Sequence, residues 1–166
     1  MNLNDIRSGE RVLLDANILL YAIQRASGQC KRLLTRCAED DITGILPNHV
    51  FAMVMQHLMI AEARDNGWVA GSNLGRQLRD QPDRVRALVR YESLMRDILA
   101  IGFHEEPLER EDFLTALPIQ RQSGLLASEA LLLALGQRLR INAVVSANSA
   151  LASVQGMMLY SPDDLE

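Results

Sequence analysis

A short, unbroken apolar run constrains the fold of this chain most strongly. Val12, Leu13 and Leu14 stand together without polar alternation, and Asp15 follows them directly. Such a run is typical of a strand with both faces covered. A helical pattern starts at once, so a carboxylate lies at the carboxyl end of a buried strand, where open α/β sheets build their sites. From this stretch alone, Asp15 could equally be a cap of the following helix or a site residue.

Strand and helix patterns alternate along the rest of the chain. Strands are expected at 11–15, 43–46, 101–103, 142–146 and 157–160. Helices are expected up to about residue 24 and at about 30–38, 48–64, 82–98, 108–122, 128–139 and 148–154, and Ser128 is expected to cap the 128–139 helix. Residues 1–10 are expected to be a loose lead-in, and 67–81 have no clear pattern. This alternation predicts an α/β fold with a central parallel sheet of four to five strands and helices on both faces. One domain is expected over residues 1–166.

Composition limits the location and the partners of the protein. The charged amino end and the lack of an apolar run near 18 residues predict a cytoplasmic protein without a membrane span. Cys30 and Cys37 lie seven apart in one expected helix, roughly 10 Å along its axis, and are predicted to be reduced structural thiols. The net charge of −4 predicts no general affinity for nucleic acid. The stretch 64–96 is locally basic, which fits phosphate contacts, an Arg-rich codon usage or a solvated helical arm.

Four stretches resemble the PIN domain, and most closely the ribonuclease toxins of bacterial toxin–antitoxin modules. The stretches are VLLDAN at 12–17, LPNHVFAM at 46–53, GLLASEALLLA at 124–134 and VVSAN at 144–148. Their order and spacing match the family over nearly the whole chain, through Tyr160-Ser161-Pro162. The resemblance implies a PIN-like open α/β sandwich and a set of acids around Mg²⁺ or Mn²⁺. It also implies RNA as a substrate, an antitoxin-like protein partner and a homodimer.

Phosphodiester hydrolysis explains why that family needs several acids. A divalent ion activates water and offsets the charge of the transition state, and Mg²⁺ prefers oxygen ligands. Carried over by the resemblance, the first acid is kept as Asp15, its polar neighbour as Asn17, and the small hydroxyl after the fourth strand as Ser146.

The other acids of the family pattern are changed. Met53 stands in place of a Glu, and Glu129 in place of an Asp. Asn148 stands in place of another Asp, and Ala150 in place of a further Asp that only some members have. One carboxylate beside a divalent ion contributes on the order of several kcal/mol before desolvation. The pattern therefore predicts an eroded site with weak or no nuclease activity, in which Met53 only lines the cleft with Asn17 and Ser146.

Two alternatives to an eroded site remain open. The chain could be an active ribonuclease, with Asp15 and Glu129 catalytic and with Asn148 completing a weak Mg²⁺ or Mn²⁺ site. It could instead be a binding module for RNA or a protein, with 64–96 as its contact face. His49, Gln56 and His57 could assist metal binding from the helix that carries Met53, although packed or surface roles are more usual for them.

The remaining polar residues are not expected to take part in chemistry, and two other α/β families match the sequence less well. Glu62, Glu105 and Glu106 are expected to be solvated, and His104 to form a polar pair with Glu105 at a strand end. A receiver domain needs an acid pair at the first strand, and a haloacid-dehalogenase-type phosphatase needs an Asp where Asn17 stands.

Overall fold

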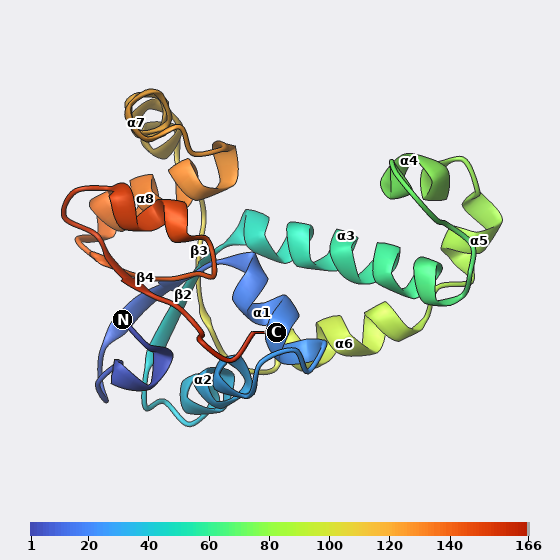
Figure 1. Cartoon of the computed structure of the whole chain (residues 1–166), viewed down its shortest axis with the longest axis horizontal. Helices are drawn as coiled ribbons and strands as arrows, with labels where there is room; N and C mark the ends of the chain where they lie inside the picture. The colour runs from blue at the N-terminus through green and yellow to red at the C-terminus, as the bar shows by residue number, and fades with distance from the viewer. Residues whose placement is uncertain (166) are drawn as a thin grey trace.

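A parallel five-stranded sheet forms the centre of the structure, a computed structural model that describes residues 1–165 (Figure 1). The strands are β1 (Arg11–Leu14), β2 (Thr43–Pro47), β3 (His104–Glu106), β4 (Ala143–Val145) and β5 (Met158–Tyr160). They are ordered β3-β2-β1-β4-β5, and every neighbouring pair is parallel. The predicted α/β class and parallel sheet are confirmed. The strand that precedes Asp15 lies at the centre of the sheet.

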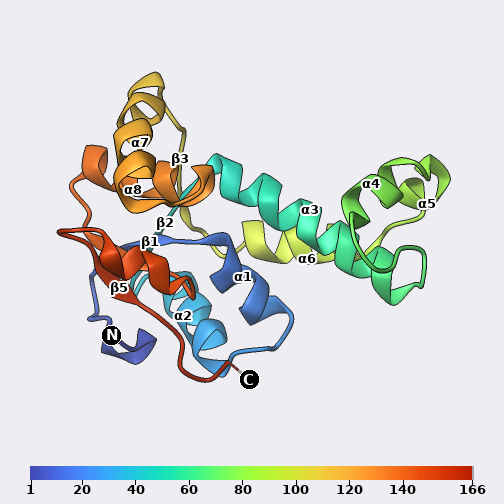
Figure 2. The same ribbon diagram turned by 45° about the horizontal axis from the view of Figure 1, so that its top comes forward.

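Helices cover both faces of this sheet, as predicted. They are α1 (Ala16–Ile23), α2 (Gly28–Ala38), α3 (Asn48–Asp65), α4 (Leu74–Arg79), α5 (Pro82–Arg86), α6 (Arg90–Leu99), α7 (Arg110–Ser123) and α8 (Ala127–Leu139), with short 3-10 helices η1 (Leu3–Asp5) and η2 (Ser149–Ser153). Figure 2 shows α1 and α2 on one side of the sheet, and α7 and α8 on the other. Among residues 1–165, no helix has the length and apolar character that a membrane crossing requires.

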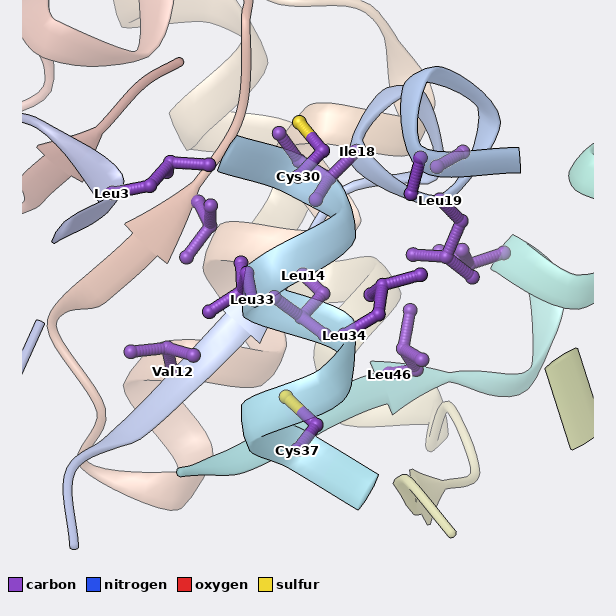
Figure 3. Packing of buried hydrophobic residues seen from close by; sticks show 14 of the residues in the cluster. Leu3, Val12, Leu14, Ile18, Leu19, Cys30, Leu33, Leu34, Cys37 and Leu46 are labelled. Carbon is purple, nitrogen blue, oxygen red and sulfur yellow. The ribbon is translucent and has the colours of Figure 1, made fainter. Parts of the chain in front are cut away.

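The burial of β1 explains its sequence. Val12 and Leu14 pack in the core on the side of α1 and α2, whereas Leu13 packs in the core on the side of α8. All three side chains are fully buried. Figure 3 shows Val12 and Leu14 near Leu33 and Leu34 of α2. Because both faces of β1 are covered, neither face carries a polar residue.

Gly136 allows α8 to approach this strand closely. A Cβ atom at this position would lie 2.6 Å from Leu13 Cδ1 and 2.8 Å from the carbonyl oxygen of Ile141. A larger residue would therefore push α8 away from the sheet. The close contact fixes the distance of α8 from the sheet, and the first turn of α8 carries Glu129.

The two cysteines are structural, as the sequence predicts. Cys30 and Cys37 are free thiols of α2 in the core on the side of α1 and α2 (Figure 3). Burial raises the pKa of Cys37 to about 11 and also raises the pKa of Cys30. A buried thiol with a raised pKa is unreactive.

The predicted third strand at 101–103 is wrong, because β3 begins at His104, the residue after that range. Gly102 has φ +84° and turns the chain, so the apolar residues beside it do not enter the sheet. β3 instead pairs His104, Glu105 and Glu106 with β2 at the sheet edge. An edge strand open to solvent carries polar residues, so no apolar run in the sequence predicts it. The predicted pairing of His104 with Glu105 is wrong. His104 Nε2 lies 2.8 Å from Glu106 Oε1, because residues two apart in a strand lie on the same face.

The amino end is also more ordered than predicted. Residues 1–10 contain η1, and both Leu3 and Ile6 are buried, at 2% exposed each. Asn2 and Asp5 cap this short helix reciprocally. Leu3 and Ile6 each stand between polar residues in the sequence, so no apolar run marks this helix.

The long α3 extends beyond the sheet and carries a projecting arm (Figure 1). We define the arm as residues 59–99, which include the outer part of α3, and α4, α5 and α6. It has a small core of its own, built around Ala63, Val69, Leu78 and Leu88. The unclear 67–81 region therefore contains a real helix, α4.

Glu62 is the residue that divides the predicted 82–98 helix into α5 and α6. It was expected to be solvated, but it is only 5% exposed. Its Oε1 accepts hydrogen bonds from the backbone N–H groups of Val89 at 2.9 Å and Arg90 at 3.0 Å, and its Oε2 from that of Tyr91 at 2.8 Å. A carboxylate from α3 thus caps the start of α6, where unpaired N–H groups favour negative charge.

We expect Glu62→Gln to weaken the attachment of α6 by about 1.5–3 kcal/mol, the range for hydrogen bonds to charged groups. The amide keeps one acceptor oxygen but turns a donor towards a backbone N–H. Amide hydrogen exchange in α6 should become faster, while exchange in β1 stays slow. Glu92→Gln removes an exposed carboxylate paired with Arg96 and is the matched control, with an expected cost below about 1 kcal/mol. Equal exchange rates in both variants would contradict the capping role.

Candidate functional site

The polar segments that the sequence singled out meet in one cleft at the carboxyl end of the sheet. The cleft has a volume of about 190 Å³. It is lined by Asp15, Ala16, Asn17 and Leu20 from the start of α1, Met53 and His57 from α3, and Ser128 and Glu129 from α8. Ser146 and Asn148, after β4, reach the same residues through hydrogen bonds. The predicted convergence of these elements is therefore present in the fold.

Asp15 faces this cleft and does not cap α1. It occupies the N-cap position but makes no side-chain cap hydrogen bond. Its Oδ2 accepts hydrogen bonds from Ser146 Oγ at 2.6 Å and from Asn17 Nδ2 at 2.9 Å. Asn17 Nδ2 also lies 3.1 Å from Ser146 Oγ, so the three side chains form a closed triangle. Only 7% of Asp15 is exposed.

The environment of Asp15 disfavours its charge. Burial is the largest effect and raises the pKa of this carboxyl, and the nearby charge of Glu129 raises it further. The hydrogen bonds from Ser146, the Ala16 backbone and Asn17 lower the pKa but do not offset the burial. A pKa raised in this way is the response expected of a carboxylate that has lost contact with water and has no cation beside it.

Glu129 is held by the side-chain amide of Asn148. Asn148 Nδ2 donates a hydrogen bond of 3.0 Å to Glu129 Oε1. The carbonyl oxygen of the same amide, Asn148 Oδ1, accepts from the Ala150 N–H at 3.0 Å and so caps η2. Glu129 Oε2 is buried and has no hydrogen-bond partner among the described residues.

Met53 fills its side of the cleft with a thioether. Ser128 Oγ lies 3.1 Å from Met53 Sδ and 3.2 Å from His49 Nε2. Ser128 was predicted to cap its helix, but α8 has Leu126 at the N-cap position, and the Ser128 hydroxyl points across to α3 instead. Met53 and Ser128 are separated by 75 residues, and no local sequence signal indicates their contact.

The two histidines of α3 do not form a metal site with these residues. His49 is partly buried, which lowers its pKa, and its Nδ1 has no hydrogen-bond partner within residues 1–165. His57 lines the cleft, but its Nδ1 lies 2.8 Å from the Met53 carbonyl oxygen and its side chain is exposed. Gln56 lies outside the cleft and lines a different pocket, beside α4.

The donor set does not fit a tightly bound Mg²⁺ or Mn²⁺. Two carboxylates reach the cleft, and each already accepts a hydrogen bond from a neighbouring side chain. Within the described part of the chain, no three His, Cys, Asp or Glu side chains are grouped so that they could hold a metal ion. In that part, Glu129 Oε2 is the one buried carboxylate oxygen left without a partner. Mg²⁺ requires near-octahedral oxygen coordination.

Replacing Asp15 with Asn should stabilise the protein at pH 7 and change little near pH 4. The folded-state pKa of Asp15 lies above its ordinary value of 3.8. Its favourable contribution is therefore complete below that value and is lost as the pH rises through the folded-state pKa. Urea unfolding should show that the advantage of Asp15→Asn widens from pH 4 to pH 7. Asp97→Asn, on the exposed side of α6, is the control and should show no such trend. An advantage that stays constant with pH would contradict the raised pKa.

Comparison with known proteins identifies similar structures but no similar sequences. No protein-family model matches the chain, and no curated protein matches it. One solved chain that matches comes from VapBC2 of Rickettsia felis bound to a DNA fragment from their promoter. That match has a TM-score of 0.59 and 14% identity, and it covers 92% of this chain and 99% of the other. Another comes from a toxin–antitoxin complex of Klebsiella pneumoniae, with a TM-score of 0.52 and 16% identity over 89% and 95% of the two chains.

A third match is to VapC20 of Mycobacterium tuberculosis, described as a sarcin-ricin loop cleaving toxin. It has a TM-score of 0.54 and 10% identity over 86% of this chain and 93% of that one. At such identities the similarity establishes the fold and carries no residue-level assignment. It extends over nearly the whole length of each matched chain.

Proposed function

We propose that this chain, which has the PIN-domain fold, has an eroded nuclease site and acts by binding RNA with weak or no cleavage. In this proposal residues 1–166 form one domain that works in the cytoplasm. Asp15 and Glu129 remain from the acidic site, with Asn17, Met53, Ser146 and Asn148 around them.

One observation carries the proposal. The side-chain amide of Asn148 holds Glu129 at 3.0 Å, and a thioether, Met53, occupies the adjacent wall. In a working site, a metal ion would supply the positive charge that two or more acids need. Here amide and hydroxyl hydrogens supply the partners of both carboxylates instead. The cleft is thus stabilised without an ion, and only two carboxylates, Asp15 and Glu129, remain in it to hold one.

An active Mg²⁺- or Mn²⁺-dependent endoribonuclease is the second candidate. The unpartnered, buried Glu129 Oε2 supports it, because a carboxylate oxygen that is left over among the described residues could contact an ion beside Asp15. Asp15 and Glu129 would then be catalytic and, with Asn148, would hold the ion weakly. When bound, the ion would activate a water molecule for attack on the phosphodiester.

A protein partner also fits the surface of the chain. Phe113, Leu114 and Leu117 of α7 are between 52% and 62% exposed, and Leu126, just before α8, is 75% exposed. Large apolar side chains grouped on one surface often mark a protein interface. We propose that this surface serves an antitoxin-like partner or a homodimer, in keeping with the complexes in which similar chains were found.

RNA binding in EDTA tests the proposed function without interference from cleavage. A fluorescent RNA hairpin should bind, and its affinity should fall linearly with the logarithm of the salt concentration. The slope should be about −0.7 for each single-strand phosphate that the protein contacts. Absence of binding at low salt would contradict the RNA-binding proposal and would leave the protein partner as the role to pursue.

A further inference from the structure

We infer that a second pocket, at the base of the arm, binds a phosphate group through Arg25, Arg64 and Arg90. The pocket has a volume of about 640 Å³, well above that of the cleft. It lies where the end of α1 meets the outer half of α3 and the start of α6. The inference deepens the proposed RNA binding and rests on it for the source of the phosphate.

The charge around this pocket is positive. Three guanidinium groups line it against one carboxylate, Asp65. Arg90 Nη2 pairs with Asp65 Oδ2 at 2.5 Å, which neutralises that pair. Within residues 1–165, the side chains of Arg25 and Arg64 make no ion pair or hydrogen bond, so both forks are available to a ligand. Leu58 and Leu94 form part of the apolar wall.

The chemistry of these groups favours phosphate. Arginine presents a planar fork of N–H donors that matches the oxygens of a phosphate, and several forks can share one phosphate. Three of the five other arginines of 64–96 are less available for this role. Arg86 and Arg96 form ion pairs, and Arg84 lies over the ring of Trp68. Among the described residues, Arg76 and Arg79 of α4 have no ion pair either, but neither lines this pocket, so the phosphate site that we infer is the one at the base of the arm.

The pocket and the cleft share two helices. In α1, Leu20 lines the cleft and Ile23 lines the pocket, and in α3, His57 lines the cleft and Leu58 lines the pocket. Met53 and Arg64 are eleven residues apart in α3, about 16 Å along the helix axis at 1.5 Å per residue. A stacked strand rises about 3.4 Å per nucleotide, so roughly five nucleotides would join the two sites.

The backbone at Arg25 allows a clean test of its side chain. Arg25 follows the end of α1 in the left-handed conformation, with φ 59°. The N–H of Arg25 donates to the Ala22 carbonyl at 3.3 Å, and the N–H of Ala26 donates to the Tyr21 carbonyl at 2.9 Å. Glycine is the residue most favoured at this position of such a helix end. Arg25→Gly therefore removes the guanidinium without harming the fold, and its melting temperature should equal or exceed that of the wild type.

The experiment compares Arg25→Gly and Arg64→Gln with Arg121→Gln, an equal charge change on an exposed position of α7. Inorganic phosphate is titrated while the Arg side-chain NMR signals are followed, and a fluorescent RNA hairpin is titrated in EDTA. Phosphate should shift the signals of Arg25 and Arg64 and should compete with the RNA. Each pocket variant should weaken RNA binding by about tenfold and reduce the salt slope by about one, whereas Arg121→Gln should match the wild type.

The possible results separate the two proposals. RNA binding that neither pocket variant weakens overturns the phosphate pocket and leaves the RNA-binding function standing. Phosphate binding that both variants lose, without any RNA binding, supports the pocket with free phosphate as its ligand and overturns the RNA-binding function. If the wild type binds neither ligand, both proposals are overturned.

Discussion

Arg138→Met is expected to lower the free energy of unfolding by about 3–5 kcal/mol, the cost of leaving a buried charge without its partner. Asp112 is 1% exposed, and its carboxylate is held from three directions. Arg138 Nε donates to Asp112 Oδ1 at 2.9 Å, Arg138 Nη2 donates to Oδ2 at 3.0 Å, and the Glu109 N–H donates to Oδ2 at 2.8 Å. The pair joins the start of α7 to the end of α8. Met keeps most of the side-chain length but offers no donor.

Urea unfolding of three further variants isolates this effect. Arg121→Met, on an exposed position of α7, should change stability by less than about 0.5 kcal/mol. Asp112→Asn combined with Arg138→Met removes both charges, and should recover part of the loss, because the penalty comes from the unpaired carboxylate. Asp112→Asn alone completes the double-mutant cycle. A loss below about 1 kcal/mol in Arg138→Met would contradict the proposed dependence of α7 and α8 on this pair.

Restoring two acids should make the stability of the protein depend on metal. In Met53→Glu with Asn148→Asp, a carboxylate replaces the Asn148 amide that now donates to Glu129 Oε1, and a second new carboxylate joins Asp15 in the cleft. Four carboxylates would then repel one another. Losing the hydrogen bond from Asn148 to the charged Glu129 should cost about 1.5–3 kcal/mol in EDTA. For a chain of 166 residues that corresponds to a fall of roughly 5–10 °C in melting temperature.

Adding Mn²⁺ should reverse this loss in the double variant and leave the wild type nearly unchanged. An ion present at about 100 times its dissociation constant stabilises the folded state by about 2.7 kcal/mol. Met55→Glu with Asn142→Asp is the matched control, because it makes the same charge change at exposed positions of α3 and of the loop before β4. Equal responses to Mn²⁺ in the double variant and this control would mean that Met53 and Asn148 do not belong to one site.

The central part of the fold could be predicted from local patterns. Val12, Leu13 and Leu14 are buried on both faces of the sheet, and this kind of environment leaves an unbroken apolar run in the sequence. The edge strand has no such run, because His104 and Glu105 face solvent. The break between α5 and α6 depends on Glu62, which comes from another helix 27 residues earlier than Val89. A cap supplied from that distance leaves no trace in the local sequence.

The candidate site was predictable where it follows strand ends and unpredictable where side chains meet by packing. Asp15, Ser146 and Asn148 lie directly after β1 and β4, so the parallel topology alone brings them together. The contact between Met53 and Ser128 depends on the packing of α3 against α8, and the sequence predicted a helix cap for Ser128 instead. Side-chain direction in a helix changes by about 100° per residue. An error of one residue in the predicted start of α8 therefore changes the predicted direction of the Ser128 hydroxyl.

Cleavage of structured RNA in Mg²⁺ or Mn²⁺ tests the central claim most directly. Wild type and Asp15→Asn are purified in parallel and incubated with the same RNA, with EDTA as the blank. The eroded site predicts little or no metal-dependent cleavage by the wild type above that of Asp15→Asn. Efficient metal-dependent cleavage that EDTA stops and Asp15→Asn lacks would contradict the claim, because it would mean that Asp15 and Glu129 support catalysis without the missing acids.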